Sequence, residues 1–97
     1  FSIFKIKGSS MDPLLNPDSY ILTIKNRPEL KKIFVISHKK YGKLIKKLVK
    51  IDNEENFWFK GENNSSISTE KIGPIKLNQI LGKVVLSVSK DTLKFHC

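Results

Sequence analysis

The chain has 97 residues, enough for a single domain over residues 1–97 with a modest core. Its hydrophobic content of 39% is that of an ordinary globular domain, and it contains no run of about 18 apolar residues that could span a bilayer. Eighteen basic residues against nine acidic ones give a net charge of +9. Arg27 is the only arginine, whereas arginine is the side chain that reads phosphates and guanines in bidentate fashion. A solvated lysine-rich surface is therefore favoured over a nucleic-acid interface.

Short β-type segments separated by turn residues recur along the chain. Such segments, without a long amphipathic helix, predict a mostly β domain. The first segment places Phe4 and Ile6 on one face and lysines on the other. A helical turn is also expected over Asp12–Leu15, because Pro13 suits the first position of a helix. The expected strands, in chain order, are Phe1–Lys7, Ser19–Ile24, Ile33–Ile36, Lys43–Ile51, Asn56–Lys60, Gln79–Val88 and Thr92–Phe95.

Cysteine and histidine provide no recognisable site. Cys97 is the only cysteine, so it has no partner for an internal disulfide or a thiolate metal site. His38 and His96 are far apart in the sequence and lack the spacing of metal ligands. His38 lies in a polar, turn-like stretch and His96 lies near the C-terminus, so we expect both at the surface. We expect no metal, no cofactor and no catalytic histidine.

The stretch Gly8-Ser9-Ser10-Met11-Asp12-Pro13-Leu14-Leu15 is the first candidate for chemistry. A serine that leaves a strand on tight backbone can expose its hydroxyl, and nearby N–H groups can bind an oxyanion. By itself, a Gly-Ser-Ser tripeptide is typical of an ordinary loop. A serine hydroxyl also needs a base, and this chain has no well-placed histidine to supply one.

A lysine pair inside an apolar run is the second candidate. A lysine can act as the base if burial lowers its pKa enough to keep the amine neutral. In a strand, Lys46 shares a face with Leu44 and Leu48, while Lys47 points to the opposite face. At least one lysine would then meet apolar surroundings. Periodicity alone favours the alternative, in which both amines reach water from an edge strand.

These segments together resemble a known family. The stretch from Gly8 to Leu15 resembles the G-x-S-M-x-P-x-L box of signal peptidase I and its small relatives. The second box of that family, a strand lysine usually followed by arginine, is similar to Ile45-Lys46-Lys47-Leu48-Val49. Its third box resembles Gly61-Glu62-Asn63 with Ser66 and Gly73-Pro74-Ile75, and its closing strand resembles Ile80-Leu81-Gly82-Lys83-Val84. The four boxes stand in the family's order and extend over nearly the whole chain.

The resemblance implies a small mostly β catalytic domain of the signal peptidase/LexA-like, β-barrel type. It also implies a Ser/Lys dyad in which Ser10 attacks the scissile carbonyl and Lys46 accepts its proton. The Ser10 N–H would contribute to the oxyanion hole, and Ser66 would orient the lysine amine. The remaining support residues that it implies are Gly8, Met11, Gly61 and Asn63.

Several positions depart from the family's pattern. Gly8 stands where some relatives have a hydroxyl near the oxyanion hole. Glu62 replaces the usual aspartate of the third box, and Lys47 replaces the usual arginine of the second. The acid–arginine pair that follows in the family is absent, with Ser68 and Glu70 in its place. The nucleophile and the base are both kept.

The short chain is most similar to the nickel-type superoxide dismutase maturation proteases within this family. That similarity implies a serine endopeptidase that removes an N-terminal propeptide or signal peptide from a protein precursor, and a cytoplasmic location. A fragment of a membrane-anchored signal peptidase I is an open alternative, because the chain begins at Phe1 and residues upstream could carry the anchor. A LexA-type self-cleaving regulator shares the dyad, but the segment 61–73 resembles signal peptidase more.

A different class of protein also remains open, namely a non-catalytic basic β domain that binds nucleic acid. Phe57, Trp58 and Phe59 beside Lys60 would supply stacking surfaces for bases. Consecutive residues of a strand alternate between its faces, however, so at least one of the three rings is expected in the core. No nucleic-acid partner is expected.

Overall fold

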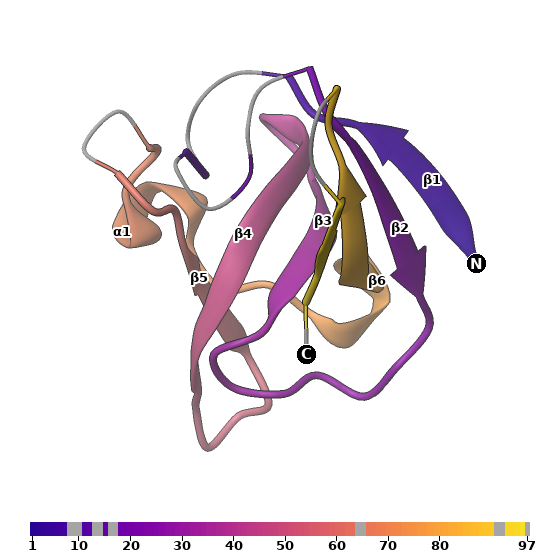
Figure 1. The fold of residues 1–97 in the computed structure, drawn as a ribbon. Helices are drawn as coiled ribbons and strands as arrows, with labels where there is room; N and C mark the ends of the chain where they lie inside the picture. Colours follow the sequence, from indigo (N-terminus) through magenta and orange to yellow (C-terminus); the bar gives the residue numbers. More distant parts are fainter. Residues whose placement is uncertain (8–10, 13–14, 16–17, 64–65, 91–92, 97) are drawn as a thin grey trace.

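The computed structural model describes residues 1–7, 11–12, 15, 18–63, 66–90 and 93–96. Its strands form one antiparallel sheet, and two short helical segments lie beside it (Figure 1). All seven expected strands are confirmed, with bounds that shift by a few residues. The elements are β1 (Ser2–Lys5), β2 (Tyr20–Ile24), β3 (Ile33–His38), β4 (Gly42–Ile51), β5 (Phe57–Lys60), α1 (Thr69–Ile72), η1 (Leu77–Gln79), β6 (Ile80–Val88) and β7 (Leu93–Phe95).

The sheet is open. Its strand order is β1-β2-β6-β3-β4-β5, and β7 pairs with β6 outside this path. Strand β6 is long enough to pair with β3 along its first half and with β7 along its second half, opposite β2. Among the described residues β1 does not pair with β4 or β5, so the expectation of a barrel was wrong while the expectation of a mostly β domain is confirmed. Register shifts leave Leu81 and Val85 of β6 and Val49 of β4 as extra residues opposite their partner strands, and such bulges generally increase local twist.

Strand β3 is buried on both faces, which explains why Ile33–Ile36 is a continuous apolar run. Alternate residues of the run enter two separate core clusters, because successive side chains of a strand point to opposite faces. The first cluster contains Ile6, Met11, Leu15, Ile21, Ile33, Val35 and Val84. The second contains Phe34, Ile36, Leu48, Phe57, Phe59, Ile72 and Ile75.

The two helical segments were not predicted. The Oγ of Ser68 accepts a hydrogen bond from Lys71 N at 3.3 Å and so caps α1, whose one buried residue is Ile72. Gly73 ends this helix with φ of 73°, a conformation that side chains with a Cβ avoid. A single turn of helix is too short to produce a periodic apolar pattern. The helical turn expected over Asp12–Leu15 lies partly outside the described residues.

The histidines are less exposed than we expected. The Nδ1 atom of His38 accepts hydrogen bonds from Lys40 N at 3.0 Å and Tyr41 N at 3.1 Å. Its Nε2 therefore carries the hydrogen and donates to Ile72 O at 2.8 Å, which ties the β3–β4 turn to α1. His96 is half-buried beside Ser87, with 2.9 Å between Nε2 and Oγ, and burial lowers its pKa. Both rings have structural roles.

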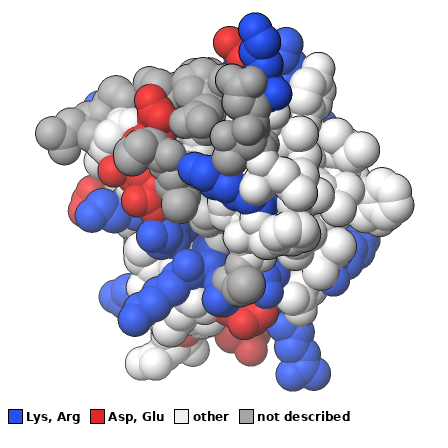
Figure 2. Space-filling model, in the orientation of Figure 1, with Lys and Arg blue, Asp and Glu red and all other residues white. Residues whose placement is uncertain are grey.

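None of the described helices is long and apolar enough to cross a membrane. Charged side chains of both signs are interspersed on the face shown in Figure 2, with uncharged surface between them.

Candidate active site

Lys46 lies in the middle of β4, where the structure buries it almost completely. Its side chain is 1% exposed, and its cross-strand partner on β3 is Phe34. Leu48, on the same face of β4, is fully buried. The expectation that both lysines of the pair reach water was thus wrong for Lys46, because the loop after β5 brings Gly61 against its amine.

Burial lowers the pKa of the Lys46 amine, because the apolar surroundings disfavour its charged form. The two ion pairs within the described part of the chain involve Lys47 and Lys83 and leave this amine without a carboxylate partner. A carboxylate beside the amine would favour the charged form and oppose the effect of burial. The environment of Lys46 thus favours a neutral amine, which can accept a proton.

The loop after β5 places Ser66 and the Lys46 amine against the same glycine. A Cβ atom built on Gly61 would overlap the Oγ and Cβ of Ser66 and would lie 3.1 Å from Lys46 Nζ. A side chain at Gly61 would displace Ser66 and press on the Lys46 amine, so a glycine here lets both groups lie against the loop backbone. The role of Ser66 in orienting the amine stays a prediction.

Lys47 and Glu62 form an ion pair of 2.8 Å that links β4 to the same loop. Both side chains are partly exposed, at 33% and 24%. By the resemblance to signal peptidase, these two residues are separate departures from the pattern. In the structure they are partners, and the pair holds the strand of Lys46 against the loop that contains Gly61.

Asn63 connects this loop to the segment that follows Ser10. Its Nδ2 donates a hydrogen bond to Asp12 O at 2.9 Å. Met11, next to Asp12, is 2% exposed and packs in the first core cluster. The loop after β5 is therefore tied both to the strand of Lys46 and to the backbone two residues after Ser10.

Gly8 and Ser10 lie outside the described residues, as does Ser9. Their described neighbours in the sequence, Lys7 and Met11, both line the pocket described next. Ser68 and Glu70, at which the resemblance would have an acid–arginine pair, belong to the N-terminal end of α1, where Ser68 is the cap. Among the described residues, no group of three or more His, Cys, Asp or Glu side chains could hold a metal ion.

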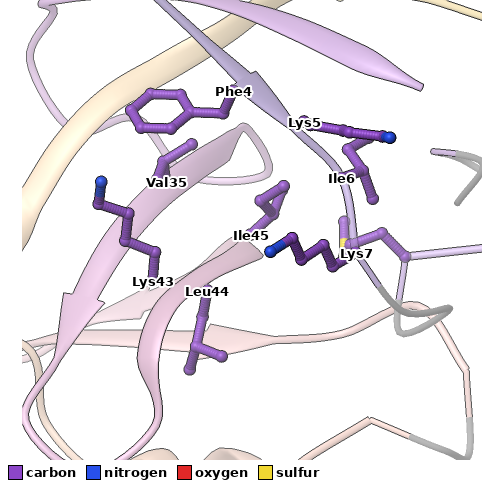
Figure 3. Close-up of a pocket in the computed structure, with 9 residues that line it drawn as sticks. Phe4, Lys5, Ile6, Lys7, Val35, Lys43, Leu44 and Ile45 are labelled. Carbon is purple, nitrogen blue, oxygen red and sulfur yellow. The ribbon is translucent and has the colours of Figure 1, made fainter. Parts of the chain in front are cut away.

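A pocket of about 390 Å³ lies between β1 and β4 (Figure 3). Ile45 contributes to its wall from β4 and directly precedes Lys46 in the sequence. Met11 also lines the pocket and directly follows Ser10 in the sequence. The pocket thus adjoins both predicted dyad residues in the sequence, while Ile45 and Lys46 point to opposite faces of β4. Its lining residues are Phe4, Lys5, Ile6, Lys7, Met11, Val35, Lys43, Leu44 and Ile45.

Sequence reasoning missed this pocket, the link from Asn63 to Asp12 and the pairing of Lys47 with Glu62. The alternation of Phe4 and Ile6 with lysines indicated an apolar face but not what lies opposite that face. Opposite charges at Lys47 and Glu62, both in boxes of one site, were the signal that could have indicated the ion pair. The other two features depend on contacts between distant segments, which alternation within one strand does not report.

Comparisons with protein-family models, with curated proteins and with solved structures found no match.

Proposed function

We propose that this chain is a serine endopeptidase in which Ser10 is the nucleophile and Lys46 is the general base. The observation that carries the proposal is the environment of Lys46, a lysine 1% exposed whose pKa is lowered by burial and whose amine lies against Gly61 beside Ser66. A buried amine without a described carboxylate partner is costly for folding. Such a residue is typical of sites where an ionisable group serves chemistry.

In the acylation step, the Oγ of Ser10 attacks the carbonyl carbon of the scissile bond while its proton passes to Lys46 Nζ. The carbonyl oxygen becomes an oxyanion, which accepts a hydrogen bond from the backbone N–H of Ser10. When the tetrahedral intermediate collapses, the C–N bond breaks and the departing amine takes the proton from Lys46. The acyl group remains as an ester on Ser10, and Lys46 is neutral again.

In the deacylation step, Lys46 takes a proton from a water molecule as its oxygen attacks the ester carbonyl. The second tetrahedral intermediate releases the carboxylic acid product, and the proton returns to the Oγ of Ser10. Ser66 keeps the amine oriented toward the reacting atoms in both steps. An amine that starts neutral is needed each time, which is why burial of Lys46 supports this mechanism.

A substrate can bind as an extended strand between β1 and β4. Among the described strands, β1 pairs only with β2, and β5 pairs with β4 only from Lys47 onward. The residues of β4 before Lys47 therefore have one described neighbour, β3. An extended peptide that pairs with a free strand edge would place one side chain in the pocket, whose lining residues Met11 and Ile45 adjoin Ser10 and Lys46 in the sequence.

We further propose that the substrate is a protein precursor whose N-terminal propeptide or signal peptide is removed, with a nickel superoxide dismutase precursor as the first candidate. A membrane-anchored signal peptidase I remains the alternative within the same chemistry. Both assignments rest on the resemblance of the four sequence boxes.

The test is cleavage of two substrates, a nickel superoxide dismutase precursor and a generic signal peptide, by the wild type, Ser10→Ala and Lys46→Ala. Loss of a general base lowers rates by about 10²- to 10⁴-fold, and loss of the nucleophile should leave no acyl-enzyme. Lys50→Ala is the matched control, since Lys50 is an exposed lysine of the same strand. Cleavage that survives in Ser10→Ala or Lys46→Ala would refute the dyad.

The rival proposal is a basic domain that binds nucleic acid, and the net charge of +9 is the observation in its favour. Phe57 and Phe59 are 8% and 0% exposed, so their rings are core residues and offer no stacking surface. Trp58 is half-buried and donates a hydrogen bond from Nε1 to Asp52 Oδ2 at 3.0 Å. Steeply salt-dependent oligonucleotide binding by a folded protein that cleaves neither substrate would favour the rival.

A further inference from the structure

We infer that the pocket between β1 and β4 selects an acidic peptide segment, in which an apolar side chain fills the pocket and Asp or Glu residues two positions away contact Lys43 and Lys7. The inference rests on the proposed peptidase function and adds a substrate preference to it. It is drawn from the side chains at the pocket and from their charges.

The pocket combines an apolar wall with a cationic mouth. Phe4, Ile6, Met11, Val35 and Ile45 supply most of the wall, and an aliphatic or small aromatic side chain matches that chemistry. Figure 3 shows the ammonium groups of Lys43 and Lys7 directed toward this wall from two different segments. A ligand that enters would meet hydrocarbon inside and positive charge beside it.

Contacts with the wall hold Lys43 at the pocket. Its Nζ lies 5.3 Å from the centroid of the Phe4 ring, within the range of a cation–π contact. In Figure 3 the ammonium of Lys7 lies beside Ile45. A charge that already lies in place loses less side-chain entropy when a carboxylate binds than a freely moving lysine does.

The positive charge at the mouth is not neutralised locally. The nine residues that line the pocket include no Asp or Glu. Within the described part of the chain, the ion pairs use Lys47 and Lys83, so neither Lys7 nor Lys43 has a carboxylate partner. Both side chains are exposed and can reach an incoming ligand. The mouth therefore favours an anionic segment over a neutral or basic one.

The spacing follows from the geometry of an extended peptide. Residues i and i+2 of a strand point to the same side and are separated by about 6.6 Å along the chain. When residue i fills the pocket, the residues two before and two after it point toward the same face, where Lys43 and Lys7 lie. Carboxylates at these two positions are the natural partners of the two amines.

Peptide binding to the Ser10→Ala protein tests the inference, because binding is measured without cleavage. Two labelled peptides share a central Leu and differ only in having Glu or Gln two positions to either side. At low salt, we expect the Glu peptide to bind about 2- to 5-fold more tightly for each carboxylate, which is the range for exposed ion pairs. Raising the salt concentration should reduce the difference.

Lysine variants then assign the preference to the pocket. Lys43→Gln and Lys7→Gln should each remove part of the advantage of the Glu peptide. Lys50→Gln, which makes the same charge change on an exposed lysine of β4, should leave it intact. Equal affinities for the two peptides, no binding of either one, or an equal effect of Lys50→Gln would each overturn the inference. If the protein binds dodecanoate but neither peptide, the pocket is a lipid site and the inference is also overturned.

The same peptides separate this inference from the proposed function. If the wild type cleaves Glu and Gln versions of a precursor equally well, the acidic preference is refuted and the peptidase stands. If it cleaves neither while the Glu peptide still binds more tightly, the peptidase is refuted and the preference of the pocket stands.

Discussion

Replacing Lys46 by Met should remove a pH dependence of stability that the buried amine creates. In the unfolded chain the lysine has its ordinary pKa, about 10.5, and in the folded protein burial lowers that pKa. Between the two pKa values the unfolded state binds more protons than the folded state. The unfolding free energy of the wild type therefore rises with pH in this window, by up to about 1.4 kcal/mol per pH unit.

Met has a similar length and flexibility but does not titrate, so this contribution to the slope disappears in Lys46→Met. Below the folded pKa both states of the wild type are protonated, and the cost of the buried charge is fully present. The variant should then be more stable than the wild type, by about 1.4 kcal/mol for each unit by which burial lowers the pKa. The advantage should shrink steadily as the pH rises through the window.

Urea unfolding at a series of pH values from about 6 to 10 measures this difference. Lys50→Met is the control, because Lys50 is exposed and its replacement should give a difference that does not change with pH. The Lys46→Met protein should also be inactive against any substrate that the wild type cleaves, since it has no base. Stability curves of the wild type and Lys46→Met that run parallel over the whole range would refute the buried neutral amine.

Three further predictions concern the surroundings of Lys46 and the acid stability of the fold. Gly61→Ala should lower the unfolding free energy by about 1–3 kcal/mol, because its methyl group would overpack against Ser66. In a Ser66→Gly background the same change should cost much less, and equal losses in both backgrounds would contradict the contact. Reversing either charge of the pair between Lys47 and Glu62 should slow substrate cleavage, and reversing both should restore the cleavage rate. Unchanged cleavage rates in the single variants would contradict a positioning role for the pair. Hydrogen bonds from Asn56, Trp58 and Glu54 lower the pKa of Asp52 to about 2. The stabilisation that the ionised Asp52 provides should therefore disappear as the pH falls from about 4 to about 2. In an acid titration of stability, Asp52→Asn should lack this loss of unfolding free energy.

Local patterns were enough to predict the strands. The alternation of Phe4 and Ile6 with lysines, and the apolar run Ile33–Ile36, predicted strands that the structure contains. Both patterns arise because successive side chains of a strand point to opposite faces. The closure of the sheet is not encoded in any single strand. The expectation of a barrel was wrong, because β1 and β5 do not pair with each other among the residues that the structure describes.

The sequence by itself determined that Lys46 and Lys47 point to opposite faces of one strand, since a period of two allows nothing else. Only the tertiary structure decided which of them is buried. Lys46 faces Phe34 and the loop with Gly61, whereas Lys47 reaches Glu62 near the surface. The physical reason is that burial, and with it the lowered pKa of the amine, depends on segments that are distant in the sequence and meet only when the sheet has folded.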